Sequence, residues 1–408
     1  MLITSKSACP LLIVLLLIGG LTILSVSVPV HAGSITVPDD YPMIQQAINA
    51  ASEGDEIFVK AGLYHEAIVV DETVALRGEN REATVLSSGD LQGVTVSSSN
   101  VEISGFTIRD CPRTGISILS NSCLITDNNI IGILNFGGIL LDGRNTQVEG
   151  NVIFNNSIIG NDDDGITMMN AKRNYVIGNN ISENHFVGLY LYSDSSFNVV
   201  SDNEFTGNWD AGIIIALNSD HNEIINNSIS GSGMNPSNPF PLMFGCGIGL
   251  ITYACSNRLM GNLISNNYIG VLQDNYANDN LVYRNSFITN TRQFANSGSP
   301  AASFWDNGYP IGGNYWSDYN GTDVKKGSGQ DELGSDGIGD VPYVLDEYNV
   351  DHYPLMQPHV RLRGDVDDNG KVDMMDVGLV VLAGIFFSLS WAFVSLCERV
   401  RDAGPDTF

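Results

Sequence analysis

Positive charge is scarce in this chain of 408 residues. It has 19 lysine and arginine residues against 46 aspartate and glutamate residues, and its formal net charge is −27. Binding to the phosphates of a nucleic acid needs a basic surface, and so does binding to an anionic membrane. The composition therefore predicts no nucleic acid partner and disfavours an anionic membrane surface.

Cysteine is also scarce, with six residues in the whole chain. This number is too small for a fold built on disulfide bonds, and we expect free thiols, with a local bond between Cys246 and Cys255 as the alternative. Glycine, in contrast, occurs 43 times, and asparagine is similarly frequent. Both residues are poor in helices and in ordinary strands, so the composition predicts a chain that turns often and regularly.

Two short patterns recur along the middle of the chain with a shared period. The first is hydrophobic–x–x–Asn–x–hydrophobic, and the second is Gly–hydrophobic–x–hydrophobic. The asparagines of the first pattern are Asn128, Asn151, Asn179, Asn203, Asn227, Asn262 and Asn285. The glycines of the second pattern are Gly115, Gly138, Gly165, Gly188, Gly212, Gly247 and Gly270. Both patterns lengthen at nearly the same places, which indicates one repeating unit.

Such a repeat predicts an all-β solenoid of parallel strands stacked coil on coil. No repeat contains a segment of helical length, which excludes a leucine-rich horseshoe. Alternation along the strands predicts one inward column. Its members are Ile116, Ile139, Ile166, Leu189, Ile213, Ile248 and Val271. The asparagines are expected to form a ladder, because their amides can bond to the coils above and below.

The repeat resembles the right-handed parallel β-helix of the pectin-lyase type, and more narrowly the periplasmic copper-binding NosD family with its carbohydrate-binding-and-sugar-hydrolase repeats. Segments 313–319 and 334–343 resemble the C-terminal part of that family. The resemblance covers residues 34–357 and implies a β-helix over 33–295 with a cap region over 296–358. An amphipathic helix from about Tyr41 to Ala51 is expected to cover the N-terminal end of the core.

Residues 1–32 have the pattern of a secretory signal peptide. Lys6 is followed by an apolar stretch from Leu11 to Val28 and by the small-residue site Val30-His31-Ala32. An uncleaved N-terminal anchor is the alternative. We therefore expect a secreted or cell-surface protein.

The turns before three successive repeated glycines, Gly165, Gly188 and Gly212, contain the candidate catalytic residues. These are Asp162, Asp163, His185 and Asp210. The repeat makes Asp162 and His185 stacked neighbours. Asp163 and Asp210 are expected two coils apart, about 10 Å by the strand spacing. Inverting glycosidases separate their carboxylates by about 6.5–9.5 Å. These residues do not establish an enzyme, because turns of a β-helix are naturally rich in aspartate. If the protein is an enzyme, we expect a polysaccharide hydrolase or lyase.

Aromatic side chains near this turn are candidates for binding sugar rings. They are Tyr190 and Tyr192 on the adjoining strand and Trp209 in the turn. Copper binding, which the family resemblance implies, is not expected, because the histidines form no close pair in register and copper favours clusters of soft ligands.

The tail contains the sharpest local motif, an EF-type calcium loop. Oxygen ligands are expected at loop positions 1, 3, 5, 7, 9 and 12. They are Asp365, Asp367, Asn369, Lys371 through its carbonyl, Asp373 and Asp376. Residues 361–383 resemble one repeat of a type I dockerin, which implies a cohesin-type protein partner. Dockerins normally have two such loops, and this chain has one.

Residues 377–397 contain no charged side chain and are followed by Glu398 and Arg399. A stretch of about 20 such residues can span a bilayer. A C-terminal membrane anchor and a truncated dockerin helix are the two interpretations.

The sequence predicts a protein that binds or processes a polysaccharide or surface glycan, with calcium bound in its tail. A non-enzymatic structural or adhesive solenoid is the first alternative, and a copper-delivery accessory protein is the second.

Overall fold

The computed structural model describes residues 13–17, 20–24, 33–89, 92–135, 137–234, 244–274, 276–298 and 301–359. These residues divide between two units. The first contains the described residues from 33 to 359, and the second contains strands β1 (Ile13–Leu17) and β2 (Gly20–Leu24), which pair antiparallel. The predicted calcium loop and the stretch 377–397 lie outside the described residues. The signal peptide stays a prediction.

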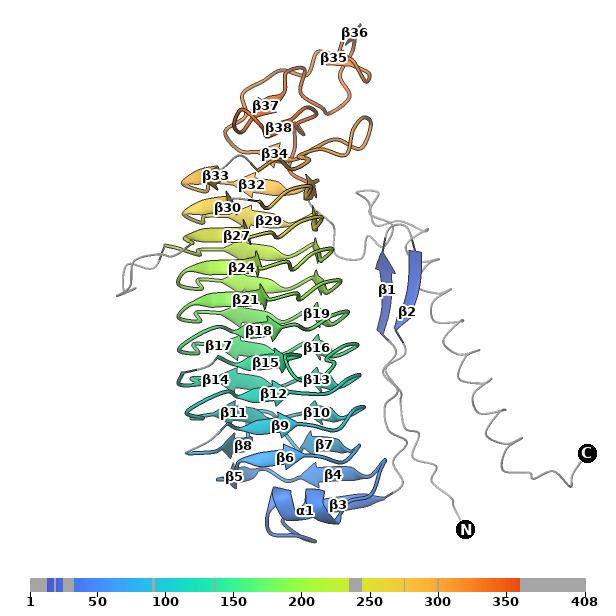
Figure 1. The fold of residues 1–408 in the computed structure, drawn as a ribbon, viewed down its shortest axis with the longest axis vertical. Coiled ribbons are helices and arrows are strands. Elements are labelled where there is room, and N and C mark those ends of the chain that lie inside the picture. The colour runs from blue at the N-terminus through green and yellow to red at the C-terminus, as the bar shows by residue number, and fades with distance from the viewer. Residues whose placement is uncertain are drawn as a thin grey trace, which may run out of the picture. The chain divides into compact units, whose positions relative to one another are not determined.

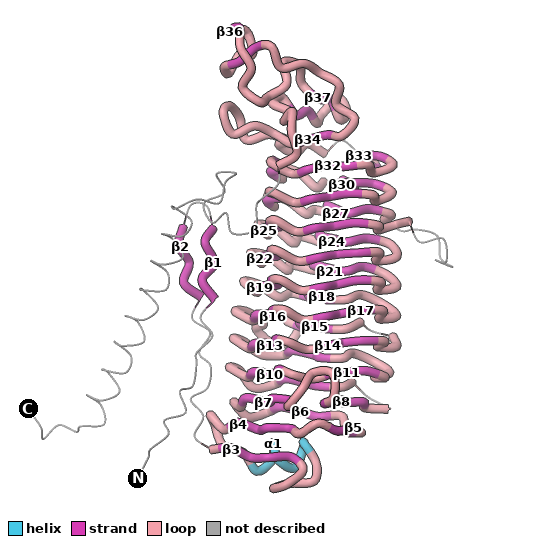
Figure 2. The backbone as a smooth tube through the Cα atoms, turned by 180° about the vertical axis from the view of Figure 1, so that it is seen from behind, coloured by secondary structure: helices cyan, strands magenta, loops and turns pink. Residues whose placement is uncertain are grey.

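The first unit is a parallel β-helix of about 11 coils, whose strands stack into three parallel sheets of 11, 11 and 10 strands (Figures 1 and 2). The first sheet contains β3 (Ser34–Val37), β4 (Glu56–Val59), β7 (Ala75–Gly78), β10 (Glu102–Ser104), β13 (Leu124–Thr126), β16 (Val152–Phe154), β19 (Tyr175–Ile177), β22 (Val199–Ser201), β25 (Glu223–Ile225), β28 (Arg258–Met260) and β31 (Leu281–Tyr283).

The second sheet contains β5 (Gly62–Tyr64), β8 (Thr84–Ser87), β11 (Thr107–Arg109), β14 (Asn129–Ile131), β17 (Ser157–Ile159), β20 (Asn180–Ser182), β23 (Glu204–Thr206), β26 (Ser228–Ser230), β29 (Leu263–Ser265), β32 (Ser286–Ile288) and β34 (Tyr315–Trp316). The third sheet contains β6 (Ile68–Val70), β9 (Val94–Val96), β12 (Ile116–Ile118), β15 (Ile139–Asp142), β18 (Ile166–Met169), β21 (Val187–Tyr192), β24 (Ala211–Ala216), β27 (Cys246–Ile251), β30 (Ile269–Asp274) and β33 (Arg292–Ser297). The all-β parallel solenoid is therefore confirmed.

The predicted inward column is confirmed in register. Ile116 pairs with Ile139, and the pairing continues coil by coil to Val271. All seven side chains of this column are at most 1% exposed and belong to the main hydrophobic core. Branched aliphatic side chains in stacked layers bury a continuous core that no single coil could bury alone.

The asparagines form three ladders rather than one, because each of the three turns of the coil carries its own. The ladder between the first and second sheets runs through Asn128, Asn156, Asn179, Asn203, Asn227, Asn262, Asn285 and Asn314. Our assignment of Asn151 to this ladder is wrong. Asn151 starts the ladder between the third and first sheets, where it bonds to Asn174. Asn151 and Asn156 are five residues apart in one coil, so the sequence pattern fits either of them.

Helix α1 (Ile44–Ala50) lies at the N-terminal end of the stack (Figure 1). Ile44, Ala47 and Ile48 occupy one face of this helix and are fully buried in the core. The carboxylate of Glu66 accepts hydrogen bonds from the first backbone N–H groups of the helix, those of Ile44 and Gln45, at 2.9 and 3.0 Å. The predicted helix is present, and its role as an end cap stays a prediction.

The C-terminal part of this unit adds two short hairpins. Strands β35 (Lys325–Lys326) and β36 (Glu332–Leu333) pair antiparallel, as do β37 (Tyr343–Val344) and β38 (Val350–Asp351). A stack of aromatic rings connects the hairpin of β37 to the solenoid. Trp316 stacks on Phe287 with ring centroids 4.3 Å apart, and on Tyr343 at 4.6 Å.

Four of the cysteines lie among the described residues, and all four are free thiols, Cys246 and Cys255 included. In the same part of the chain, no helix has both the length and the apolar character that crossing a bilayer requires.

Candidate functional site

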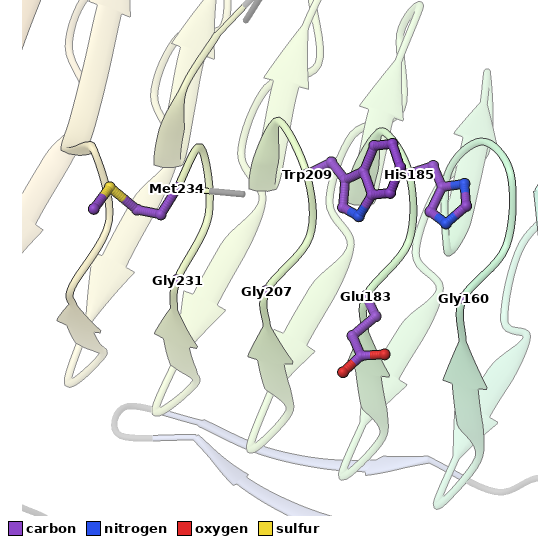
Figure 3. A pocket seen from close by; sticks show the side chains of 7 residues that line it. All are labelled: Gly160, Glu183, His185, Gly207, Trp209, Gly231 and Met234. Carbon is purple, nitrogen blue, oxygen red and sulfur yellow. The ribbon is translucent and has the colours of Figure 1, made fainter. Parts of the chain in front are cut away.

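A groove of about 480 Å³ lies beside the turn that joins the second sheet to the third. The residue directly after each of four successive strands, β17, β20, β23 and β26, contributes to it. These residues are Gly160, Glu183, Gly207 and Gly231. His185, Trp209 and Met234 complete the lining (Figure 3).

The glycines keep the floor of the groove low. All four positions after the strands have positive φ angles, between 56° and 71°, a conformation that glycine adopts without steric cost. A Cβ atom at Gly160 would meet nothing within 4 Å, and one at Gly207 would meet only the side chain of Glu183 at 4.0 Å. Glu183 therefore projects a single carboxylate from a row that otherwise carries no side chains.

Asp162, His185 and Trp209 lie on successive coils, and the last two line the groove. His185 Nδ1 lies 3.1 Å from Oδ1 of Asp162. The imidazole of His185 stacks on the indole of Trp209, with ring centroids 3.9 Å apart and planes inclined by 22° (Figure 3). Asparagines directly before these residues hold the coils in register, since Asn161 bonds to Asn184 and Asn184 to Asn208. The predicted adjacency of Asp162, His185 and Trp209 is present, while their roles stay predictions.

Asp163 and Asp164, which directly follow Asp162, are more buried than Asp162. Burial raises the pKa of Asp163. Burial and the neighbouring charge of Asp163 raise the pKa of Asp164 to about 8. Thr167 Oγ1 donates a hydrogen bond to Asp164 Oδ2 at 2.7 Å, and the backbone N–H of Val187 donates to Oδ1 at 3.2 Å. Asp164 is thus an interior carboxyl that holds its proton more tightly than an exposed aspartate does. The sequence predicts that these crowded aspartates raise one another's pKa, but it does not include Asp164 among the candidate catalytic residues.

Asp210, a predicted catalytic residue, is only 2% exposed. Its carboxylate accepts hydrogen bonds from the backbone N–H groups of Phe244, at 3.1 Å, and Gly245, at 2.9 Å. These two residues precede β27. Asp210 therefore holds the chain that enters the next coil, and this geometry does not favour it as a reacting group.

Tyr190 and Tyr192, the other predicted sugar-binding residues, do not line the groove with Trp209. They lie on β21 with ring centroids 5.2 Å apart in an edge-to-face arrangement. Tyr190 also contacts Phe244, and it packs against a buried apolar cluster on the outer face of the third sheet. Burial and nearby Asp164 raise the pKa of Tyr190. The two tyrosines are half-buried, and Tyr190 packs as part of the fold.

Among the described residues, no three side chains of histidine, cysteine, aspartate or glutamate gather in a way that could hold a metal ion. Cys111, Cys123 and Cys246 are buried, and burial raises the pKa of their thiols. These donors do not fit copper, which favours clustered soft ligands.

Sequence reasoning missed Glu183 and Met234. Met234 falls in the long insertion between two coils, where the repeat gives no register. Glu183 could have been found, because it precedes the ladder residue Asn184 just as Gly160 and Gly207 precede Asn161 and Asn208. In a column of glycines, the position that carries a carboxylate is conspicuous.

Fold and groove together define a parallel β-helix protein with an aromatic and acidic groove on one edge. The model of the family described as "Periplasmic copper-binding protein (NosD)" matches residues 48–238 and 243–321. The chain belongs to this family. A probable ABC transporter binding protein NosD from Pseudomonas aeruginosa is 35% identical over 106 residues, which are 26% of this chain and 22% of the relative. The match thus spans about a fifth of the relative's length.

Solved structures with a similar fold share little sequence with this chain. The pectate lyase Pel9A is 13% identical, with a TM-score of 0.42, and the match covers 70% of this chain and 82% of that one. The A-module of the mannuronan C-5 epimerase AlgE6 from Azotobacter vinelandii is 15% identical, with a TM-score of 0.44, over 64% of this chain and 91% of that one.

Proposed function

We propose that this protein is an exported β-helix protein that binds a polysaccharide in the groove lined by Glu183, His185 and Trp209. The stacked pair of His185 and Trp209 is the observation that carries the proposal. Sugar rings have apolar faces that pack on aromatic rings, while their hydroxyl groups need donors and acceptors at the edge of the ring. The groove offers both within neighbouring coils.

Polar groups around the ring pair suit the hydroxyl groups of a sugar. The aspartate beside Nδ1 orients the imidazole of His185, which leaves Nε2 for a ligand. The carboxylate of Glu183 lies on the same coil as His185 and can accept hydrogen bonds from sugar hydroxyl groups. Glycines on both sides of Glu183 leave room for a chain that runs along the stack, across successive coils.

Processing of the bound chain is the further part of this proposal. Hydrolysis of a glycosidic bond needs an acid and a base on opposite sides of the scissile bond. Glu183 and His185 are the groove residues that can carry protons. Release of reducing ends from the bound polysaccharide would establish an enzyme, and its absence with intact binding would establish a binding protein.

The proposal also includes export of the protein and a calcium site in its C-terminal tail. Export rests on the pattern of residues 1–32 and on the periplasmic description of the family. Calcium binding by residues 365–376 rests on the spacing of their oxygen ligands. A cohesin-type partner would follow from the dockerin resemblance of that loop.

Copper delivery is the second candidate function, and the description of the family favours it. Titration of the full-length protein with Cu(I) and Cu(II) tests it. One stoichiometric, tight site would favour copper delivery over polysaccharide binding.

The main test is binding to a glycan array, with Trp209→Ala and Glu183→Gln as variants and Tyr253→Ala as a matched control. Tyr253 is 48% exposed and lies at a different turn, where it stacks on Tyr276. We expect the two groove variants to lose binding and the control to keep it. Binding to no glycan, or equal binding by all four proteins, would contradict the groove and favour a structural or adhesive solenoid.

A further inference from the structure

A second pocket, of about 410 Å³, lies where the last coils meet the C-terminal hairpin of β37 and β38. Its solenoid side is formed by Asp279 and Phe304. Asp279 lies just before β31, and Phe304 forms a parallel β-bridge with Leu281 of that strand. Tyr348, between β37 and β38, and His352, directly after β38, form the other side. The pocket is separate from the groove, because the two share no lining residue.

The imidazole of His352 is held in one orientation. Its Nδ1 lies 3.0 Å from Oδ2 of Asp306, which also accepts the backbone N–H of His352 at 3.0 Å. Oδ1 of Asp306 accepts the N–H of Gly308 at 3.0 Å, so the carboxylate itself is fixed. The side chain of Asp306 is 15% exposed, whereas that of His352 is 62% exposed. The opposite ring nitrogen, Nε2, is therefore available to a ligand.

Two large aromatic rings lie open beside this histidine. Phe304 is 59% exposed, and Tyr348 is 47% exposed. Exposed aromatic rings that gather in a pocket are typical of a binding site rather than of packing. The pocket thus combines open ring faces with an imidazole oriented by an aspartate. The groove has the same combination in Trp209, His185 and Asp162.

The charges of the pocket select the kind of sugar. Asp279 and Asp306 line it, and among the described residues neither a lysine nor an arginine does. Carboxylates near the ligand repel an anionic sugar, and no cation in the lining would compensate. Hydroxyl groups of an uncharged sugar, in contrast, can donate to these carboxylates and to His352.

We propose that this pocket is a second glycan-binding site and that it takes a segment of an uncharged polysaccharide, with sugar rings on Phe304 and Tyr348. This site stands on its own residues and does not need the groove. If the groove binds as proposed above, the protein is bivalent. Along the axis of the stack, the coils of the two sites are about four steps apart, roughly 20 Å at the strand spacing. The sites lie at different turns, because the groove follows strands of the second sheet whereas Asp279 lies between the third sheet and the first. One polymer that reaches both would bind with added avidity.

The test uses the full-length protein and immobilised neutral polysaccharides (β-glucan, mannan and xylan without uronic acid branches), with polygalacturonate and alginate as anionic comparisons. Variants are Phe304→Ala with Tyr348→Ala, His352→Gln, Trp209→Ala, and the triple variant that removes all three rings. Val344→Ala serves as the control, because Val344 is 65% exposed in the same hairpin and does not line the pocket. Thermal unfolding shows that each variant is folded.

We expect the double ring variant to weaken binding to a neutral polysaccharide at least tenfold, His352→Gln to weaken it less, and the triple variant to abolish it. Loss of all binding in Trp209→Ala, with an unchanged double variant, would overturn the second site and leave the groove standing. The reverse pattern would support the second site and overturn the groove. Binding restricted to the anionic polysaccharides, or absent throughout, would overturn the second site.

Discussion

The backbone N–H of Asn314 donates a hydrogen bond to Oδ2 of Asp351 at 2.7 Å. Asn314 is the last rung of the asparagine ladder between the first and second sheets, and in every earlier rung this N–H bonds to the amide oxygen of the next asparagine. Asp351 therefore takes the place of a further coil. The same oxygen accepts the indole N–H of Trp316 at 2.8 Å. One carboxylate thus ends the ladder and holds the aromatic stack.

The contribution of two buried carboxyl groups to the stability of the protein is expected to fall as the pH rises from about 4 to 8. Burial raises the pKa of Asp351 to about 7 and that of Asp164 to about 8. A carboxyl whose pKa is higher in the folded state binds its proton more tightly there than in the unfolded state. Its contribution is complete below the unfolded pKa, about 4, and is lost as the pH rises through the folded pKa. Chemical denaturation at several pH values measures the change.

Asp351→Asn and Asp164→Asn separate the two contributions. Each variant should flatten the pH dependence of the free energy of unfolding, by up to about 1.4 kcal/mol per pH unit between the unfolded and folded pKa values. Asp71→Asn is the control, because Asp71 is exposed on the surface. An identical slope in all four proteins would show that neither carboxyl has a raised pKa.

Removal of one rung from the ladder should destabilise the stack strongly. The amide oxygen of Asn203 accepts two hydrogen bonds from Asn179, and its Nδ2 donates to the carbonyl oxygen of Val176 and to Asn227. Asn203→Ala removes the acceptor of the buried Asn179 N–H and a donor to the buried carbonyl oxygen of Val176, and each unsatisfied group costs about 1–3 kcal/mol. The Nδ2 group of Asn179 keeps its bonds to Ile153 and Ile177, and the amide oxygen of Asn227 keeps the backbone N–H of residue 203. We expect a loss of about 3 kcal/mol in urea denaturation.

The control for this variant is Asn145→Ala, at an exposed position. It should change the free energy of unfolding by less than about 0.5 kcal/mol. Equal effects of the two substitutions would mean that the ladder does not stabilise the fold.

Asp210 is expected to act in stability rather than in catalysis. Asp210→Ala removes the acceptor for the backbone N–H groups of Phe244 and Gly245, and a hydrogen bond to a charged group contributes about 1.5–3 kcal/mol. The free energy of unfolding should therefore fall by about 2 kcal/mol or more. Any glycan binding should persist at temperatures where the variant is folded. Loss of binding by a folded Asp210→Ala protein would restore Asp210 as a site residue.

The tail should bind one calcium ion per chain. Isothermal titration of the full-length protein with calcium chloride measures this, and Asp365→Ala and Asp376→Ala remove the first and last ligands of the predicted loop. Both variants should lose the site, while Asp402→Ala, a change outside the loop, should keep it. Equal heats from all four proteins would mean that residues 365–376 do not form a calcium site.

Periodicity explains which parts of this structure the sequence could predict. The inward column that contains Ile116 and Val271 follows from local alternation, because a side chain two residues along a strand returns to the same face. The adjacency of His185 and Trp209 follows from counting coils. Asn151 was misplaced because three ladders share one residue type, and the pattern does not say to which turn an asparagine belongs.

Other contacts have no periodic signature. Asp351 meets Asn314 across 37 residues of irregular chain, and Asp210 meets Phe244 across the longest insertion. The pocket of Phe304 and His352 arises where the irregular C-terminal part folds back on the last coils. Contacts of this kind depend on the path of loops, which the repeat does not determine.

The ladders also have a direction. The N–H and Nδ2 groups of Asn128 donate to Asn156, those of Asn156 donate to Asn179, and the later rungs do the same. The backbone N–H of each ladder asparagine therefore finds its acceptor only when the next coil has formed. A chain that is made from its N-terminus adds coils in this order, so each new coil supplies the acceptors for the coil before it and leaves one open rung in each ladder as a template. Coils can therefore add one after another at the C-terminal end of the stack. In the ladder between the first and second sheets, this addition ends where Asp351 accepts the N–H of Asn314.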